Sequence, residues 1–267
     1  MKTRFILVIL VISFLSGICY AQTSSVPSPK MNRKMYKQFI DLHLTYPEAS
    51  KKAGIEGLVK IEFTTDTEGK VKSKKIIKPV SDEIDKEAMR IFNLIEWNPA
   101  FDYGIPKAGS GEFELQFKIK KYDKLVKRRG YTTLESQYKS DTSYNIYNAK
   151  QLDTIAIPIL NNEETNLYKY IYQQMQYPKQ AVELGIEGKV VINFIIETNG
   201  LPSNIIVEQN VGGGCTEEAL RLVSELRWIP AVKNNLAVRS KKTLFIEFRL
   251  GIDGSGNYIP NQTNPGF

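Results

Sequence analysis

Side chains that commonly do chemistry are few and scattered in this sequence. His43 is the sole histidine and has no cluster of Cys, His or carboxylate residues around it, so we predict neither a metal ligand nor a general base there. Cys215 takes the place of Ile84 in a repeat described below, which favours a buried apolar residue over a nucleophile. Glu56 and Glu187 are single acids at strand starts, interpreted as structural. We therefore predict no enzyme, no metal and no cofactor.

A glycine run offers one further possibility. Gly212 to Gly214 stand before a helix start, where backbone N–H groups could cradle a phosphate. The run lacks the Lys and Ser/Thr of a P-loop, and the repeat has Ser-Asp-Glu at 81–83, which would repel an anion. A flexible entry loop to the helix is the favoured interpretation.

One pattern occurs twice, at a constant offset of 131 residues. YPEASKKAGIEG starts at Tyr46 and YPKQAVELGIEG at Tyr177, and the register holds without a gap as far as Phe117 and Phe248. Chance similarity would not keep one register over such a length. We predict a duplicated domain of about 90 residues rather than a short-period solenoid.

The first residues have the features of an export signal. Lys2 and Arg4 precede an apolar run, 5–18, that is shorter than a comfortable membrane span, and Ala21 ends the segment. Cleavage after Ala21 is the favoured interpretation, with retention as an anchor through 5–21 and lipidation of Cys19 as alternatives. An exported location, in the periplasm, is expected.

The positive charge is concentrated between the repeats. The formal net charge is +7, and residues 118–150 hold nine Lys or Arg against three acidic residues. Nucleic acid is a poor partner for an exported protein, and anionic envelope surfaces suit this charge better. A solvated linker that keeps the chain soluble is the alternative.

Each repeat shows the same series of predicted elements. A helix over 32–44, or its counterpart before Tyr177, leads to a short helix after Tyr-Pro, then to a hairpin turning at Gly69 or Gly200. A second helix follows, with Ile84, Ala88, Ile91 and Ile95 as its apolar stripe, and Trp-x-Pro-Ala ends it. The last strand alternates apolar and polar residues.

These elements predict an α+β fold of two tandem small domains, each a three-stranded antiparallel sheet with helices packed on one face. Such a sheet cannot close, so each domain must expose strand edges. The predicted segments are a signal peptide or anchor (1–21), a first domain (31–120), a basic, Tyr-rich linker (121–159), a second domain (160–250) and a mobile tail (251–267).

The ordered motifs resemble the C-terminal domain of TonB-type energy transducers of Gram-negative bacteria. The similarity rests on YP, GIEG with an alternating strand, a Gly turn, EAM or EAL in a helix, W-x-PA, and final strands FELQFKI and LFIEFRL. The two copies together cover more than half of the chain.

The resemblance implies docking onto TonB-dependent outer-membrane transporters, whose extended peptide adds as a strand beside the last strand of the domain. It also implies a pull derived from ion-driven motor proteins of the inner membrane, which requires an anchored chain. Carried over by position, the pairing strands are 111–119 and 242–250, and Gln176 before Tyr177 matches a glutamine of the family. The predicted partner-binding residues are Lys242, Thr243, Leu244, Phe245, Ile246, Glu247, Phe248, Arg249, Gly111, Glu112, Phe113, Glu114, Gln116, Lys118, Gln176 and Tyr177.

Two functions compete on this basis. The first is a TonB-like component that supports energy-coupled transport, with the second domain as the docking one. The second is an envelope scaffold that holds peptidoglycan or partner proteins, with avidity from the linker as a tether.

Overall fold

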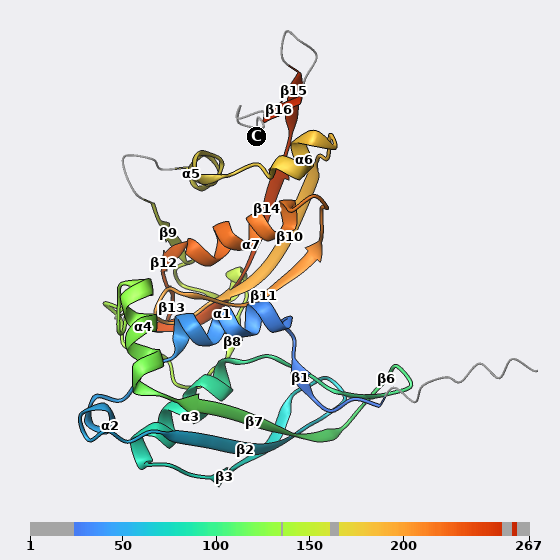
Figure 1. The fold of residues 1–267 in the computed structure, drawn as a ribbon. Coiled ribbons are helices and arrows are strands. Elements are labelled where there is room, and N and C mark those ends of the chain that lie inside the picture. Colours follow the sequence, from blue (N-terminus) through green and yellow to red (C-terminus); the bar gives the residue numbers. More distant parts are fainter. Residues whose placement is uncertain (1–23, 135, 161–165, 253–257, 261–267) are drawn as a thin grey trace, which may run out of the picture.

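The computed structural model describes residues 24–134, 136–160, 166–252 and 258–260. Two units, each with a small antiparallel sheet and helices, lie one above the other in Figure 1. The predicted α+β class with tandem domains is thus confirmed. The predicted signal or anchor at 1–21 lies outside the described residues, and no helix within them is both long and apolar enough to span a membrane.

The first unit begins with a leader strand and ends with its longest edge strand. Its sheet has the order β3-β2-β7, and both pairings are antiparallel. The elements are β1 (Ser28–Pro29), α1 (Arg33–His43), α2 (Glu48–Lys52), β2 (Gly57–Thr65), β3 (Val71–Lys78), α3 (Asp82–Leu94), β4 (Trp97–Asn98), β5 (Ala100–Asp102), β6 (Ile105–Lys107) and β7 (Gly109–Phe117).

The last strand of the first unit differs from its predicted range, 111–119. It starts at Gly109 and ends at Phe117, and Ile119 opens a helix instead of continuing the strand. The Ile119 N–H donates to Oε1 of Glu56 over 2.7 Å, so a side chain takes the place of the sheet partner there. The chain therefore leaves the sheet two residues earlier than the alternation of residue types predicts.

The Tyr-Pro and GIEG motifs form one structural unit in both copies. The Tyr46 hydroxyl donates to the carbonyl of Ile55 over 2.5 Å, and the Tyr177 hydroxyl donates to Ile186 over 2.7 Å. Each ring also meets the last strand edge-on, Tyr177 with its centroid 5.4 Å from that of Phe248. These contacts explain why the motif residues recur together: they tie the short helix to one end of the sheet, where the start of one strand pairs with the end of the last strand.

The predicted apolar stripes are confirmed in both long helices. Ile84, Ala88 and Ile91 of α3 have no exposed surface, and Cys215 and Ala219 of the equivalent helix are equally buried. The Ser81 hydroxyl caps the start of α3 by accepting the N–H of Ile84. The stripe packs on the sheet and forms the core of each unit.

The second unit repeats this arrangement with a larger sheet. Its strands run β11-β10-β14-β13, and β8 of the connector also pairs with β14, so this sheet has five strands where three were predicted. The elements are α5 (Leu167–Gln174), α6 (Lys179–Glu183), β10 (Gly188–Ile196), β11 (Pro202–Gln209), α7 (Cys215–Glu225), β12 (Arg227–Ile229), β13 (Ala231–Lys233), β14 (Leu236–Phe248), β15 (Leu250–Ile252) and β16 (Tyr258–Pro260).

The last strand of this unit also differs from the predicted 242–250. β14 begins at Leu236 because a tight hairpin joins it to β13, with Asn234 and Asn235 at φ angles of 50° and 61°. Asparagine is among the few residues that tolerate such angles. At the other end β14 stops at Phe248, and Leu250 is a half-buried residue of β15 rather than a core residue of the strand.

Much of the connector between the units is folded. Its elements are α4 (Ile119–Arg129), β8 (Ile146–Tyr147), a 3-10 turn (Ala149–Gln151) and β9 (Ile157–Ile159). α4 packs on the first unit through Tyr122 and Leu125, whereas β8 pairs with β14 and β9 with β12 of the second unit. Part of the linker therefore packs on the two units instead of extending freely between them. Of the predicted mobile tail, β15 and β16 form a hairpin, and the remainder lies outside the described residues.

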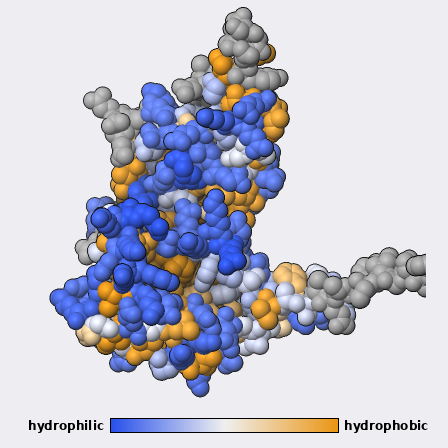
Figure 2. Space-filling model, viewed as in Figure 1, coloured by the Kyte–Doolittle hydropathy of each residue, from blue (hydrophilic) through white to orange (hydrophobic). Residues whose placement is uncertain are grey.

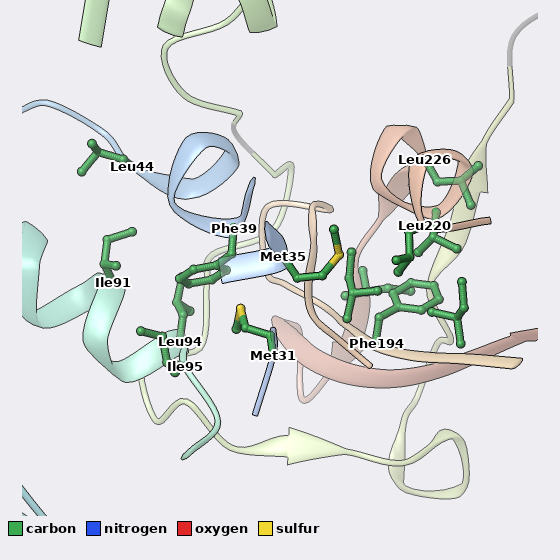
Figure 3. Close-up of a cluster of buried hydrophobic side chains, with 14 of the residues drawn as sticks. Met31, Met35, Phe39, Leu44, Ile91, Leu94, Ile95, Phe194, Leu220 and Leu226 are labelled. Atoms are coloured by element: carbon green, nitrogen blue, oxygen red, sulfur yellow. The ribbon is translucent and has the colours of Figure 1, made fainter. Parts of the chain in front are cut away.

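The two units share one continuous hydrophobic core, with α1 between them. Figure 3 shows Met35 and Phe39 of α1 between Leu94 of α3 on one side and Leu220 and Phe194 of the second unit on the other. Both α1 residues are 4% exposed or less. α1, the first helix in the described part of the chain, thus belongs to the core of both copies.

A buried polar network crosses the same contact. The guanidinium of Arg239 donates to both carboxylate oxygens of Glu197 over 2.8 Å and to the carbonyl of Leu94 over 2.7 Å. The amide of Asn204 also donates to Leu94 and accepts the N–H of Glu96. Because a buried charge is costly unless it is paired, this network holds the units in one arrangement.

Candidate functional site

The outer edge of β14 is defined by the direction of its backbone groups. In an antiparallel ladder these groups point alternately toward one neighbour and the other. Both the N–H and the C=O of Ala237 bond to the connector, at Lys139 and Asp141, on the side away from β10. Residues with odd numbers in β14 therefore direct their backbone groups outward.

The connector occupies only the first part of this edge. β8 pairs in parallel with Arg239 and Ser240, and Ser140 forms a bridge to Ala237. From Lys241 to Phe248, no strand of the described chain other than β10 pairs with β14. This leaves eight residues in extended conformation without a second strand partner, although Tyr172 of α5 hydrogen-bonds to the backbone of Glu247 near the end of the stretch.

Side chains of the open stretch divide between two faces. Leu244, Ile246 and Phe248 lie in the core with 1% exposure or less, so they could offer a partner only their backbone. On the outer face, Phe245 is 43% exposed and the ammonium of Lys189 lies 5.4 Å from its ring centroid. From Lys241 to Phe245, the edge thus combines backbone groups that no second strand pairs with one accessible aromatic ring.

Polar side chains flank that ring on the same face. The Thr243 hydroxyl donates to Oδ1 of Asn193 over 2.5 Å, and Arg249 forms an ion pair with Glu247 over 2.9 Å. Lys242 lies on the other face, with its ammonium 5.6 Å from the ring of Trp228. The backbone of Glu247 is also near α5, because a hydrogen bond with it lowers the pKa of Tyr172 while burial, the larger effect, raises it.

The corresponding edge in the first unit is β7. By equivalence with β14, Glu112, Glu114 and Gln116 direct their backbone groups outward, and β2 is the only strand of the described chain that pairs with β7. Lys60 bonds to Glu114 over 2.5 Å, and the Gln116 amide donates to the carbonyl of Gly57. Phe113 is a core residue, whereas Gly111 lies against Phe63 and Pro27 of the leader. Lys118 is the N-cap of α4 and lies 3.4 Å from Glu56.

Gln176 and Tyr177 lie at a cleft between the two units. The cleft has a volume of about 790 Å³ and is also lined by α1 and α7. The backbone N–H of Gln176 donates to Glu218, whose carboxylate also accepts from Arg221. In the first copy, Thr45, Glu87 and Arg90 make the same contacts. The Glu-Ala-x-Arg sequence is therefore a structural link between helix and Tyr-Pro turn, and burial raises the pKa of the Tyr177 hydroxyl to about 12.

The structure separates the predicted binding residues into distinct places. β7 and β14 belong to different sheets and lie in different units of Figure 1, so they form two edges rather than one site. Nothing in the sequence indicated that the connector covers part of β14. Residues 139–147 carry no alternating apolar pattern that would have indicated a pairing strand.

The other reactive groups are enclosed. Cys215 has no exposed surface, and burial raises the pKa of its thiol to about 11. His43 is buried, with Nε2 2.9 Å from the carbonyl oxygen of Pro202. The described residues contain no group of three or more His, Cys, Asp or Glu arranged to hold a metal.

Comparison with known proteins explains this repeated arrangement. No curated protein matches the chain. A family model described as "Gram-negative bacterial TonB protein C-terminal" matches twice, over residues 42–119 and 173–250, which is more than half of the chain. The two matches coincide with the two copies of sheet and helices. The chain therefore belongs to the TonB C-terminal family and carries two tandem copies of its domain.

Proposed function

We propose that the second unit docks on an extended peptide of a TonB-dependent outer-membrane transporter. The peptide adds as a strand along the outer edge of β14, from Lys241 to Phe248, and the docking supports energy-coupled transport. The observation that carries this proposal is the eight-residue stretch of β14 whose outward backbone groups have no strand partner in the described chain.

Family membership supports the general class of function. The TonB C-terminal family is one of non-enzymatic interaction domains with transport-related functions in the Gram-negative envelope, and it implies contact with outer-membrane transporters. The particular edge, register and partner belong to the proposal.

Several features favour β14 over β7. Phe245 offers an exposed aromatic surface next to free backbone groups, whereas its equivalent in β7 is Glu114, which is paired with Lys60. Strand addition derives affinity from backbone hydrogen bonds and specificity from side-chain contacts on alternate residues. β14 offers both, and Gln176 of the same unit matches the family pattern.

A proline scan of the two edges tests the proposal. Phe245→Pro removes an outward N–H without removing a hydrogen bond to β10, and proline is tolerated on edge strands. Binding of a synthetic peptide with the sequence of the extended transporter segment, measured by calorimetry, should weaken at least about tenfold. Phe245→Ala keeps the N–H and isolates the ring, and Glu114→Pro makes the equivalent change in β7.

The outcomes separate the alternatives. Loss of binding in Phe245→Pro but not in Glu114→Pro, with unchanged melting curves, supports docking at β14. Wild-type affinity in a folded Phe245→Pro variant would refute it. Binding of the chain to cell-wall fragments, but to no transporter peptide, would favour the envelope scaffold instead.

Force transmission makes a separate demand. A pull from inner-membrane motor proteins can reach the second unit only if residues 5–21 are kept as an anchor. Sequencing the N-terminus of the mature protein and fractionating the membranes decides this. A mature chain that starts after Ala21 would leave docking intact but would exclude a pull by this protein.

A further inference from the structure

The exposed face of α4 is strongly basic. Arg129 does not contribute to this face, because its guanidinium donates hydrogen bonds to carbonyl groups of the first unit at the end of α1. Tyr122 and Leu125 are buried beside it. The cations that remain exposed on α4 are Lys120, Lys121, Lys124, Lys127 and Arg128.

These cations share one side of the helix. At about 100° per residue they fall within an arc of about 120°, opposite the buried residues, along a helix about 16 Å long. The single acidic residue of α4, Asp123, is paired with Lys51 over 2.6 Å. Figure 2 shows the surface over α4, at the left of the view, as hydrophilic.

Little negative charge compensates this face. Arg128 pairs with Asp41, but the four exposed lysines of α4 form no ion pair with any residue that the structure describes. A native protein usually intersperses charges of both signs on its surface. An uncompensated basic face in this position therefore indicates an anionic partner.

A recess beside α4 extends the basic face. The recess has a volume of about 400 Å³ and lies between α1 and α4. Ile40, Leu44 and Leu125 provide apolar walls, and Lys37 of α1 adds a cation to those of α4. The one acidic residue of the lining, Asp41, is paired with Arg128. Cations around a small apolar recess suit a phosphate group joined to an apolar body.

We propose that α4 docks the protein on an anionic phospholipid surface. The cationic side is exposed, so it can contact an array of phosphates, and the adjoining recess accepts part of a lipid. Anionic membranes attract clustered lysines, and the attraction decreases with ionic strength. The family location in the envelope brings the chain next to such surfaces. This docking is independent of strand addition at β14.

Vesicle flotation with the full chain tests this inference. Vesicles of phosphatidylglycerol mixed with phosphatidylcholine are compared with pure phosphatidylcholine, so binding through the apolar run 5–18 appears in both arms and is subtracted. The variant Lys120→Glu/Lys124→Glu/Lys127→Glu should lower partition to anionic vesicles at least about tenfold. High salt should do the same to the wild type.

A matched control changes the same charge elsewhere. Lys75→Glu/Lys78→Glu/Lys86→Glu replaces three exposed lysines of the first unit outside α4. Retained binding in this control, with loss in the α4 variant and equal melting temperatures, supports the inference.

Three results would overturn the inference. Equal loss in both variants would assign binding to net charge, and a wild-type chain that does not prefer anionic vesicles would exclude a membrane. Stronger binding of polyglutamate than of vesicles would assign α4 to an acidic protein partner. Transporter-peptide binding is measured in parallel and should be unchanged in the α4 variant.

Discussion

His43 lies at the contact between the two units, where the protein has little room to hydrate a charge. Its ring is fully buried and Nε2 donates to the carbonyl of Pro202. Burial is the largest cause that lowers its pKa from 6.5 to about 4; Glu197 opposes the shift, and Arg90 and Arg239 add to it. The histidine is therefore neutral in the folded protein at neutral pH.

This histidine should make stability depend on pH. The folded pKa lies below the unfolded value, so the unfolded chain takes up a proton first as pH falls. The stabilisation is fully present above about pH 6.5 and is lost between there and about pH 4, by an amount on the order of 3 kcal/mol. Urea unfolding at a series of pH values should show the decline in the wild type. His43→Gln, which copies Gln174 of the second unit, should flatten it, and an unchanged decline would contradict this account.

The buried charged residues at the contact between the units could not be predicted from the sequence. Glu197 and Arg239 have side chains 3% and 5% exposed, but their equivalents in the first copy are Asp66 and Ala108. A charged residue in a sequence normally indicates a surface position. Glu197 and Arg239 are buried by the contact between the units, and no pattern in the nearby sequence indicates that contact.

At the scale of the element, the hairpin turns show why both copies have a glycine at the same position, Gly69 and Gly200. Gly69 and Gly200 have φ angles of 83° and 77°. A Cβ at Gly200 would lie 1.9 Å from the carbonyl oxygen of Trp228, and one at Gly69 2.1 Å from that of Trp97. The turn is thus pressed on the segment that follows the long helix, and this contact fixes the hairpin over the core.

Replacing these glycines separates close approach from backbone strain. Gly200→Ala would bring both a strained positive φ and a clash with the Trp228 carbonyl oxygen. It should lower the free energy of unfolding by at least about 2 kcal/mol. Gly104→Ala has a similar φ, 79°, but nothing within 4 Å of the new Cβ, and should cost about 1 kcal/mol. Equal losses in chemical denaturation would mean that the contact with Trp228 is not restrictive.

Sequence patterns predicted the elements inside each copy better than those between them. The apolar stripe of α3 and the alternation in β2 follow from local periodicity, which a sequence records directly. α4 was missed even though Tyr122, Leu125 and Val126 have helical spacing, because the basic residues around them suggested a solvated linker. The end of β7 at Phe117 was not predicted, because it depends on the hydrogen bond from the Ile119 N–H to the Glu56 side chain. Residue periodicity does not show such a bond.

At the scale of the whole molecule, the shared core makes two copies into one body. α1 packs on β11 of the second unit, and Leu94 of the first unit accepts hydrogen bonds from Asn204 and Arg239 of the second. Separating the units would expose apolar surface and leave buried polar groups unpaired. Neither copy is therefore complete without the other.

The two tryptophans offer a direct measure of this coupling. Trp97 reports on the first unit and Trp228 on the second, and each is 5% exposed or less. In variants Trp97→Phe and Trp228→Phe, the remaining tryptophan fluorescence should lose its native signal at the same urea concentration as the circular dichroism of that variant. Separate midpoints for the two probes would show units that unfold independently.

The connector beside β14 also limits the length of strand edge that is left for a partner. β8 holds the strand edge at Arg239 and Ser240, so only the eight residues from Lys241 onward remain, a run of about 27 Å at 3.4 Å per residue. An added strand that runs from Phe248 toward Ser240 would reach β8, which already pairs with Ser240, and would have to turn away from the sheet there. Under the proposed docking, the connector therefore limits the length of the partner strand that can pair with β14.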